Sequence, residues 1–342
     1  MAYTTVNNGS LFMNPTLYTG TGSTQSITGV NFQPDLVWLK KRSAAGNHYL
    51  FDVVRGAQKN IHSNENFAEV TEATTLTAFG SDGFTLSTDG GVNQNGATFA
   101  SWNWLANGAG SANTDGYLAS TVSVNTTSGF SIVKYLGNGS ANTVGHGLGV
   151  VPKMIIVKNL NTTDSWFVYH VSLGASNQLK LNETEASSAN QGAWNNTSPT
   201  SALFTVGNSE ATGGNGRNMI AYCFAEKQGY SKFGSYTGNG DQDGTFVYTG
   251  FKPAFVILKN STGGNNWIMK DSKRPGYNVT DDQLYPDANY AEDTNGAIDL
   301  VSNGFKTRTN LAHTNGNGST YIYMAFAEAP LVGTNNIPAN AR

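Results

Sequence analysis

The sequence predicts an all-β protein made of three tandem β-sandwich modules that are related by an internal repeat. The first indication is composition, because 40 glycines and only 13% charged residues in 342 leave little material for long helices. The second is length, which suits two or three domains of roughly 100–200 residues each. The third is a set of segments that recur in the same order and with the same spacing.

The repeat is defined by a tyrosine before a Gly-x-Gly turn, a proline 16 or 17 residues later, and a lysine 6 residues after the proline. The three copies are Tyr18, Pro34 and Lys40; Tyr135, Pro152 and Lys158; and Tyr236, Pro253 and Lys259. Glycine permits a turn with positive φ, and proline presets the entry to the next strand. Each copy therefore predicts a strand, a turn and a second strand.

Further markers follow each lysine in the same order. An aromatic residue comes 8 or 9 positions later, at Tyr49, Trp166 and Trp267, and a phenylalanine then opens another strand, at Phe84, Phe204 and Phe305. An aromatic-rich strand closes each copy, at residues 99–104, 219–224 and 321–326. We therefore expect modules at 1–116, 117–229 and 230–342, with Met1–Thr16 as a docking segment and Leu331–Arg342 as a tail.

The strands after the prolines have the pattern of buried central strands. Met154 to Val157 and Phe255 to Leu258 are continuously apolar, which is typical of a strand covered on both faces. A sandwich of two sheets accounts for this, with each proline as the first residue of its strand. Short stretches near Asn66, Glu183 and Ala291 could form a turn or two of helix, too short to be framework elements.

Charge and hydropathy exclude two classes of partner. A formal net charge of -3 with no run of Lys or Arg argues against nucleic acid. No stretch of about 18 apolar residues predicts a membrane span, and the N-terminus lacks the pattern of a signal peptide. We expect a soluble protein made in a cytoplasm, with no membrane insertion.

The sequence contains no recognisable catalytic or cofactor motif. The five histidines are scattered without zinc-ligand spacing, and neither a Gly-x-Ser-x-Gly elbow nor a phosphate-binding loop occurs. The one cysteine, Cys223, lies in an apolar run and is expected to be buried. We therefore predict no enzyme activity, with no catalytic residues, cofactor or metal.

One loop is a weak candidate for calcium. Asp241, Asp243 and Gly244 share a turn, and calcium prefers oxygen-rich loops. The other two copies lack these carboxylates, so an ordinary solvated turn is favoured and no metal site is assigned.

Aromatic residues supply the single candidate contact. Most lie in the repeated strands and are expected in the core: Tyr18, Trp38, Trp102, Trp104, Trp166 and Trp267. Trp194 is outside them, in a polar loop, where a ring could stack on a glycan or a protein surface. Trp194 is therefore the one predicted ligand or partner contact, and its exposure is left open.

The motifs at Thr143 to Gly149, Ile220 to Gly234 and Tyr321 to Pro330 carry a resemblance. Over nearly its whole length the chain resembles a family of uncharacterised proteins of marine tailed bacteriophages, virion or tail-fibre-associated proteins with concanavalin-like modules. The resemblance implies jelly-roll or lectin-like sandwiches and a place on the virion. It implies no catalytic residues.

Three functions stay open on the sequence. The first is a tail-fibre or receptor-binding adhesion protein that contacts the host surface or its glycans, and the second is a head decoration protein. The third, a glycan depolymerase, is disfavoured because no pair of carboxylates stands out. The expected partners are other virion proteins and a host glycan or receptor, and the chain could also form a homo-oligomer.

Overall fold

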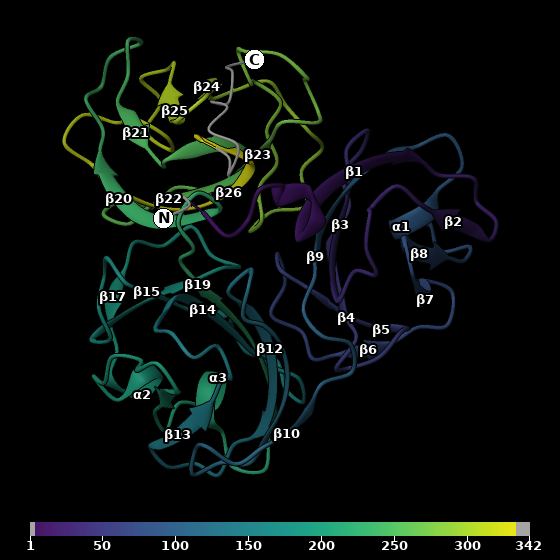
Figure 1. The fold of residues 1–342 in the computed structure, drawn as a ribbon, viewed down its shortest axis with the longest axis vertical. Coiled ribbons are helices and arrows are strands. Elements are labelled where there is room, and N and C mark those ends of the chain that lie inside the picture. Colours follow the sequence, from purple (N-terminus) through teal and green to yellow (C-terminus); the bar gives the residue numbers. More distant parts are fainter. Residues whose placement is uncertain (1–3, 333–342) are drawn as a thin grey trace.

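The computed structural model describes residues 4–332, which are mostly β-structure, with 43% in strands and 5% in helices. All of the paired strands are antiparallel, so the prediction of an all-β fold is confirmed. Figure 1 shows three lobes around a common centre. We call them the first lobe (13–104), the second lobe (111–225) and the third lobe (231–330), since no sheet takes strands from two of them.

The first lobe consists of a large sheet and a small sheet. The large sheet has the order β1 (Met13–Thr19), β9 (Thr98–Trp104), β3 (Leu36–Lys41), β4 (His48–Asp52), β5 (Lys59–His62) and β6 (Val70–Thr71). The small sheet has the order β2 (Gln25–Ile27), β8 (Gly83–Leu86) and β7 (Leu76–Gly80), the one α-helix of this lobe is α1 (Gly90–Asn93), and the short helix η1 (Gly9–Leu11) precedes the lobe.

The second lobe repeats this plan with two more strands in the large sheet and one fewer in the small sheet. Its large sheet has the order β10 (Ser111–Asn113), β11 (Ser120–Asn125), β12 (Phe130–Leu136), β19 (Asn218–Ala225), β14 (Pro152–Asn159), β15 (Phe167–His170), β16 (Asn177–Lys180) and β17 (Ser188–Ala189). The small sheet has two strands, β13 (Asn142–Gly145) and β18 (Leu203–Val206), and the helices are α2 (Gln191–Trp194) and α3 (Glu210–Gly213).

The third lobe has fewer strands than the other two. Its large sheet has the order β20 (Ser231–Thr237), β26 (Thr320–Pro330), β22 (Phe251–Asn260) and β23 (Ile268–Asp271). Its small sheet has the order β21 (Phe246–Tyr248), β25 (Gly304–Thr307) and β24 (Ile298–Val301). In each lobe apolar residues of the two sheets pack together, which gives a sandwich-like pair.

The repeated tyrosines and glycines make the same hydrogen bonds in all three lobes. The tyrosine hydroxyl donates to a backbone carbonyl, and the second glycine of the turn donates its N–H to the next carbonyl along. The hydroxyl bonds run from Tyr18 to Val92 (2.6 Å), from Tyr135 to Thr212 (2.6 Å) and from Tyr236 to Thr314 (2.5 Å). The glycine bonds run from Gly22 to Asn93 (2.8 Å), from Gly139 to Gly213 (2.7 Å) and from Gly240 to Asn315 (2.9 Å).

The central strands of each large sheet are buried on both faces, as the apolar runs predict. Along β19, Ile220, Tyr222 and Phe224 point into a core shared by all three lobes, and Met219 and Cys223 point into the core of the second lobe. Side chains alternate between faces along a strand, so a continuously apolar strand can serve two cores. The small sheet therefore covers one face of the large sheet, and the neighbouring lobes cover the other.

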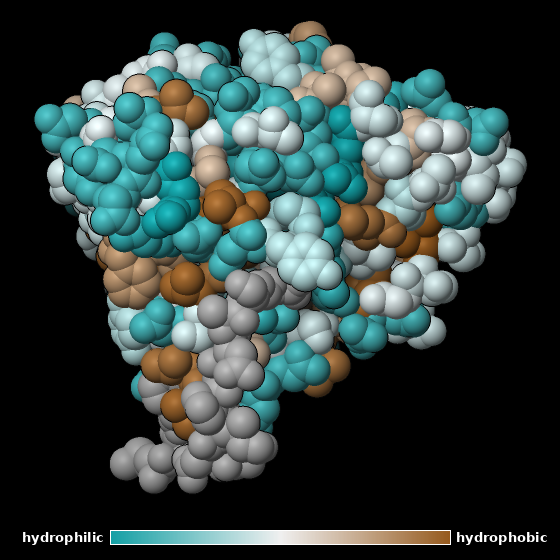
Figure 2. Space-filling model, turned by 90° about the horizontal axis from the view of Figure 1, so that it is seen from above, coloured by the Kyte–Doolittle hydropathy of each residue, from teal (hydrophilic) through white to brown (hydrophobic). Residues whose placement is uncertain are grey.

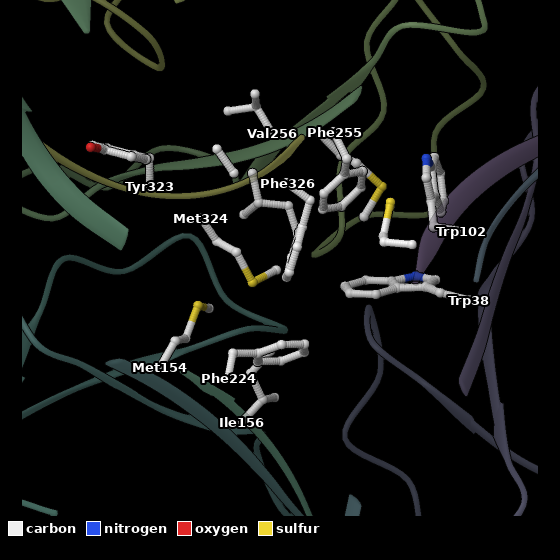
Figure 3. Packing of buried hydrophobic residues seen from close by; sticks show 14 of the residues in the cluster. Trp38, Trp102, Met154, Ile156, Phe224, Phe255, Val256, Tyr323, Met324 and Phe326 are labelled. Carbon is white, nitrogen blue, oxygen red and sulfur yellow. The ribbon is translucent and has the colours of Figure 1, made fainter. Parts of the chain in front are cut away.

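Trp104 lies at the centre of the shared core. Its ring contacts Phe224 of the second lobe and Phe255 and Phe326 of the third, at centroid distances of 6.3, 5.5 and 5.9 Å. Figure 3 shows these three phenylalanines close together in the middle of the cluster, with Trp38 of the first lobe to one side. Edge-on aromatic contacts of this kind add to the burial of large apolar rings.

The three repeated lysines link the lobes in a closed ring. Each is fully buried at the end of its strand and donates from Nζ to a backbone carbonyl of a neighbouring lobe. These bonds run from Lys40 to Asn289 (3.5 Å), from Lys158 to Asn66 (3.3 Å) and from Lys259 to Thr184 (2.7 Å). The first lobe thus reaches the third, the second reaches the first, and the third reaches the second.

Several details of the sequence analysis need correction. His48, not Tyr49, occupies the place of Trp166 and Trp267, because Leu39 pairs with Tyr49 as Val157 pairs with Phe167. Only Pro152 begins its strand, since β3 starts after Pro34 and β22 starts before Pro253, beside a register irregularity. No helix forms at the described residues near Asn66, Glu183 or Ala291; the four-residue helices lie elsewhere.

The expected module boundary, docking segment and tail compare differently with the structure. Strand β10 already pairs with β11, so hydrogen bonding passes to the second lobe before residue 117. The described part of the expected docking segment belongs to the fold, because Val6 and Met13 are buried in the shared core and β1 is a sheet strand. Residues 333–342 of the expected tail lie outside the described residues.

We predict that Trp104→Ala destabilises the whole protein by about 3–5 kcal/mol, since it empties a fully buried site that all three lobes line. Urea unfolding followed by both tryptophan fluorescence and far-UV circular dichroism measures this. Both probes should report one transition at a lower midpoint. Phe67→Ala, at a position 59% exposed, is the control and should shift stability by under about 0.5 kcal/mol. Separate transitions, with only one shifted, would contradict a shared core.

The lysine ring predicts a rise in stability at alkaline pH. Burial lowers the pKa of Lys40, Lys158 and Lys259 to about 8, so the folded state is penalised below that pH. The penalty is relieved as pH rises from about 8 toward the unfolded-state pKa of about 10.5. The free energy of unfolding should increase between pH 8 and 9.5, and it should increase less in Lys158→Met. The exposed Lys273→Met variant should keep the wild-type slope.

Candidate functional site

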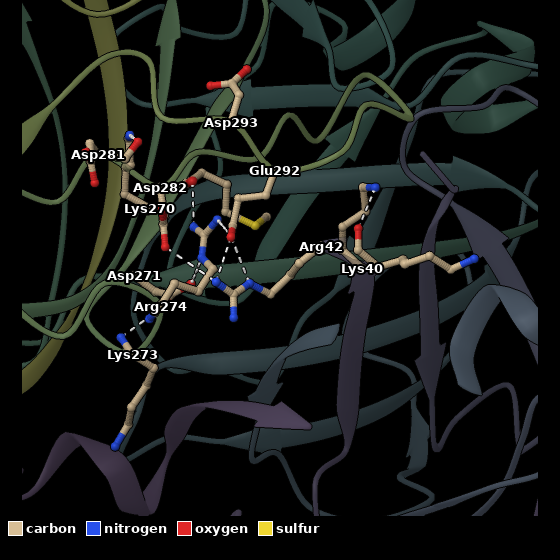
Figure 4. Close-up of polar contacts among 12 residues, drawn as sticks. Lys40, Arg42, Lys270, Asp271, Lys273, Arg274, Asp281, Asp282, Glu292 and Asp293 are labelled. Carbon is tan, nitrogen blue, oxygen red and sulfur yellow. Dashed lines mark hydrogen bonds and ion pairs between the residues drawn. The ribbon is translucent and has the colours of Figure 1, made fainter. Parts of the chain in front are cut away.

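The densest group of charged side chains lies where the first and third lobes meet (Figure 4). Arg42 of the first lobe donates two hydrogen bonds, of 2.9 and 2.6 Å, to the two oxygens of Glu292. Arg274 donates to the same carboxylate at 3.0 Å and to Asp271 at 2.6 Å. Bidentate pairs of this kind hold surfaces in a fixed orientation.

Asp271 is held ionised by its partners. Burial opposes its ionisation, but the Arg274 guanidinium and the hydrogen bond from Trp102 Nε1 outweigh burial and hold the pKa of this carboxyl below its ordinary value. Trp102 belongs to the first lobe, so this bond also joins two lobes. A carboxylate whose charged form is stabilised by paired donors is suited to a structural role.

Matching groups occur at the other two junctions. Between the first and second lobes, Asp52 is paired with Arg55 and accepts a 2.8 Å hydrogen bond from Tyr222. Between the second and third lobes, His170 Nε2 lies 3.2 Å from the carbonyl oxygen of Tyr323. The buried groups at Asp271, Asp52 and His170 therefore join lobes.

Burial disfavours the protonated form of all five histidines. Burial lowers the pKa of His62 and His170 to about 4, and it lowers the pKa values of His48, His146 and His313 as well. Within residues 4–332, no group of three or more His, Cys, Asp or Glu side chains could hold a metal ion.

In the Asp241 turn, groups of the protein itself contact the two carboxylates. Asp243 lies 2.7 Å from Lys306 Nζ and 3.6 Å from Arg308, and its backbone N–H donates to the carboxylate of Asp241 at 2.8 Å. The hydrogen bond and charge of Lys306 lower the pKa of the Asp243 carboxyl. Cations of the protein therefore already pair with the Asp243 carboxylate.

Two further expectations about burial are confirmed. Cys223 is fully buried, and burial raises the pKa of its thiol. The five tryptophans of the repeated strands are at most 2% exposed, while Tyr18 is half-buried.

In the described part of the chain, no helix has the length and apolarity needed to span a membrane.

Trp194, whose exposure the sequence leaves open, is buried, so its ring offers no surface for the predicted ligand or partner contact. It is 1% exposed and packs edge-on against Tyr169, with ring centroids 5.9 Å apart. The short helix α2 turns the ring inward, beside Phe204 and Val206 of the small sheet. The apolar pair Ala193–Trp194 within a polar segment was the available signal for this burial.

Helix α2 marks where the repeat changes. In the first and third lobes, the strands that begin near Phe84 and Phe305 pair with a preceding strand, β7 or β24. The second lobe has α2 before β18 instead. Gly207 and Ser209 fix this helix by donating backbone N–H groups to the carbonyls of Ala193 (2.9 Å) and Gly192 (3.0 Å).

A surface cavity of about 430 Å³ opens beside α2. It is lined by the turn after β12, by the polar face of α2 and by the segment after β18: Gly139, Ser140, Ala141, Gln191, Gly192, Asn195, Gly207 and Asn208. Its volume falls within the roughly 300–1,000 Å³ of small-molecule sites. Sequence reasoning missed it because three distant segments form it.

A second cavity, of about 370 Å³, lies between the linker after β19 and strand β21. Glu226 and Lys232 line it as an ion pair of 2.8 Å, and so does Tyr248, which is 53% exposed. This cavity differs from the first in carrying charges and an aromatic ring.

The fold and cavities define an all-β protein of three sandwich-like lobes with polar surface sites. A family model described as a domain of unknown function (DUF7483) matches residues 8–330, and the chain belongs to that family. No curated protein matches the sequence. The family description names no activity, so the resemblance to phage proteins stays a prediction.

We predict that Trp194→Ala lowers the free energy of unfolding by about 3–5 kcal/mol, because it leaves a large void beneath α2. Thermal or urea unfolding measures the loss. Tyr117→Ala is a control of similar size, at a site 76% exposed, and should change stability by under about 0.5 kcal/mol. Equal stability of both variants would contradict a packing role for Trp194.

Proposed function

We propose that this protein is a non-enzymatic structural protein on the outside of a bacterial virus, where it contacts the host surface or its glycans as a tail-fibre or receptor-binding adhesion protein. The observation that carries the proposal is the uncharged polar cavity beside α2, mounted on a body whose lobes are locked together. A rigid frame that positions variable loops is suited to binding.

The surface chemistry supports a contact role. The face in Figure 2 is largely hydrophilic, with hydrophobic residues in small separate groups. Single aromatic rings are exposed on different lobes, Tyr117 by 76% and Tyr277 by 80%, and aromatic residues are enriched at binding interfaces. The charged side chains at the lobe junctions are paired, which disfavours a depolymerase.

The proposal extends to the finer architecture and to partners. We infer that each lobe is one copy of a jelly-roll or lectin-like sandwich module, as the repeated tyrosine and glycine hydrogen bonds suggest. In this proposal the protein is made in the host cytoplasm, joins other virion proteins, and acts without a cofactor. A homo-oligomer on the particle would multiply weak contacts through effective concentration.

Head decoration is the second candidate. The observation that favours it is the closed, three-lobed shape, in which no helix of the described residues exceeds four residues and none could form a coiled-coil stalk. A compact body of this kind can sit on a capsid lattice directly.

The test is to locate the protein on intact particles with a gold-labelled antibody raised against the purified chain. We expect label on the tail tip or on fibres in electron micrographs. Label spread over the head would replace adhesion by decoration. Absence of label from particles that contain the gene would contradict a virion role altogether.

A further inference from the structure

We propose that the cavity beside α2 binds a neutral saccharide unit, a site that deepens the proposed function and rests on it. The cavity lining has no charged side chain and no large apolar side chain. Charged ligands would find no ion-pair partner there, and apolar ligands would find little surface to cover. Hydroxyl-rich neutral ligands fit the chemistry that remains.

The polar groups of the lining are free to bind. No hydrogen bond among the described residues engages the side-chain amides of Gln191, Asn195 and Asn208 or the hydroxyl of Ser140. Each amide offers two donors and a carbonyl acceptor, and a sugar hydroxyl both donates and accepts. The donor and acceptor groups of these side chains can therefore form hydrogen bonds with adjacent hydroxyls of one sugar ring.

The walls of the cavity are fixed before any ligand arrives. The Gly139 N–H donates to the carbonyl of Gly213, and the Asn142 amide donates to Asn138 Oδ1 at 2.8 Å, which orders the turn on one side. On the other side, Gly207 lies so close to α2 that a Cβ there would be 2.1 Å from the carbonyl oxygen of Gly192. A preorganised site lowers the entropy cost of binding.

Trp194 has a positioning role in this site. Its buried ring anchors the inner side of α2, while Gln191, one turn earlier, faces the cavity. Helix α2 precedes β18 where the other two lobes have a strand of the small sheet, so the cavity lies at one of the places where the second lobe differs from the other two.

The experiment titrates the full chain with neutral sugars (glucose, galactose, mannose and N-acetylglucosamine, and oligosaccharides of each) and with the acidic sugars glucuronic and N-acetylneuraminic acid, by calorimetry. We expect a neutral sugar to bind, with at least about a tenfold loss in the exposed double variant Gln191→Ala/Asn208→Ala. The matched control, Gln242→Ala/Asn317→Ala on the third lobe, also replaces exposed amides and should bind as the wild type does.

Three results would overturn the inference: tighter binding of the acidic sugars, binding that survives the double variant, or binding that Tyr248→Ala alone abolishes, which would move the site to the second cavity. A lack of sugar binding by a chain that still adsorbs to host cells also overturns it and leaves the proposed adhesion intact. Failure of the proposed function appears instead in the micrographs, as label on the head or no label.

Discussion

The shared aromatic core around Trp104 is the interaction on which the rest of the structure depends. Each large sheet buries one face in its own lobe and the other against its neighbours, so no lobe completes its core alone. The buried lysines, the Asp–Arg pairs and the inter-lobe hydrogen bonds occur at the edges of this core. Burying charges is costly unless they are paired, and here the partners come partly from adjacent lobes.

This arrangement separates the inner and outer parts of the protein. The inner faces carry the repeated, buried residues, and little can change there without affecting all three lobes. The outer segments do not carry that constraint: in the second lobe α2 stands where the other lobes have a strand of the small sheet, and the cavity lies beside it while β14 and β19 keep their pairing. The proposed contact site thus lies where the repeat tolerates variation.

The site itself was beyond sequence reasoning for a physical reason. Trp194 was selected because polar residues surround it in the chain, yet a short helix is enough to turn one ring inward and its neighbours outward. Gln191, Ser140 and Asn208 are unremarkable in a sequence rich in such residues, and only their convergence from three segments makes a cavity. Burial and convergence depend on distant parts of the chain.

The sequence by itself determined the β class, the order of the repeated strands and the burial of Cys223 and of five tryptophans, because alternation, turn glycines and apolar runs act locally. Only the tertiary structure decided that the lobes close around one core, that His48 and not Tyr49 matches the tryptophans, and that Lys40, Lys158 and Lys259 join neighbours. Periodicity shows that a strand has two apolar faces. What covers each face depends on packing between segments about a hundred residues apart.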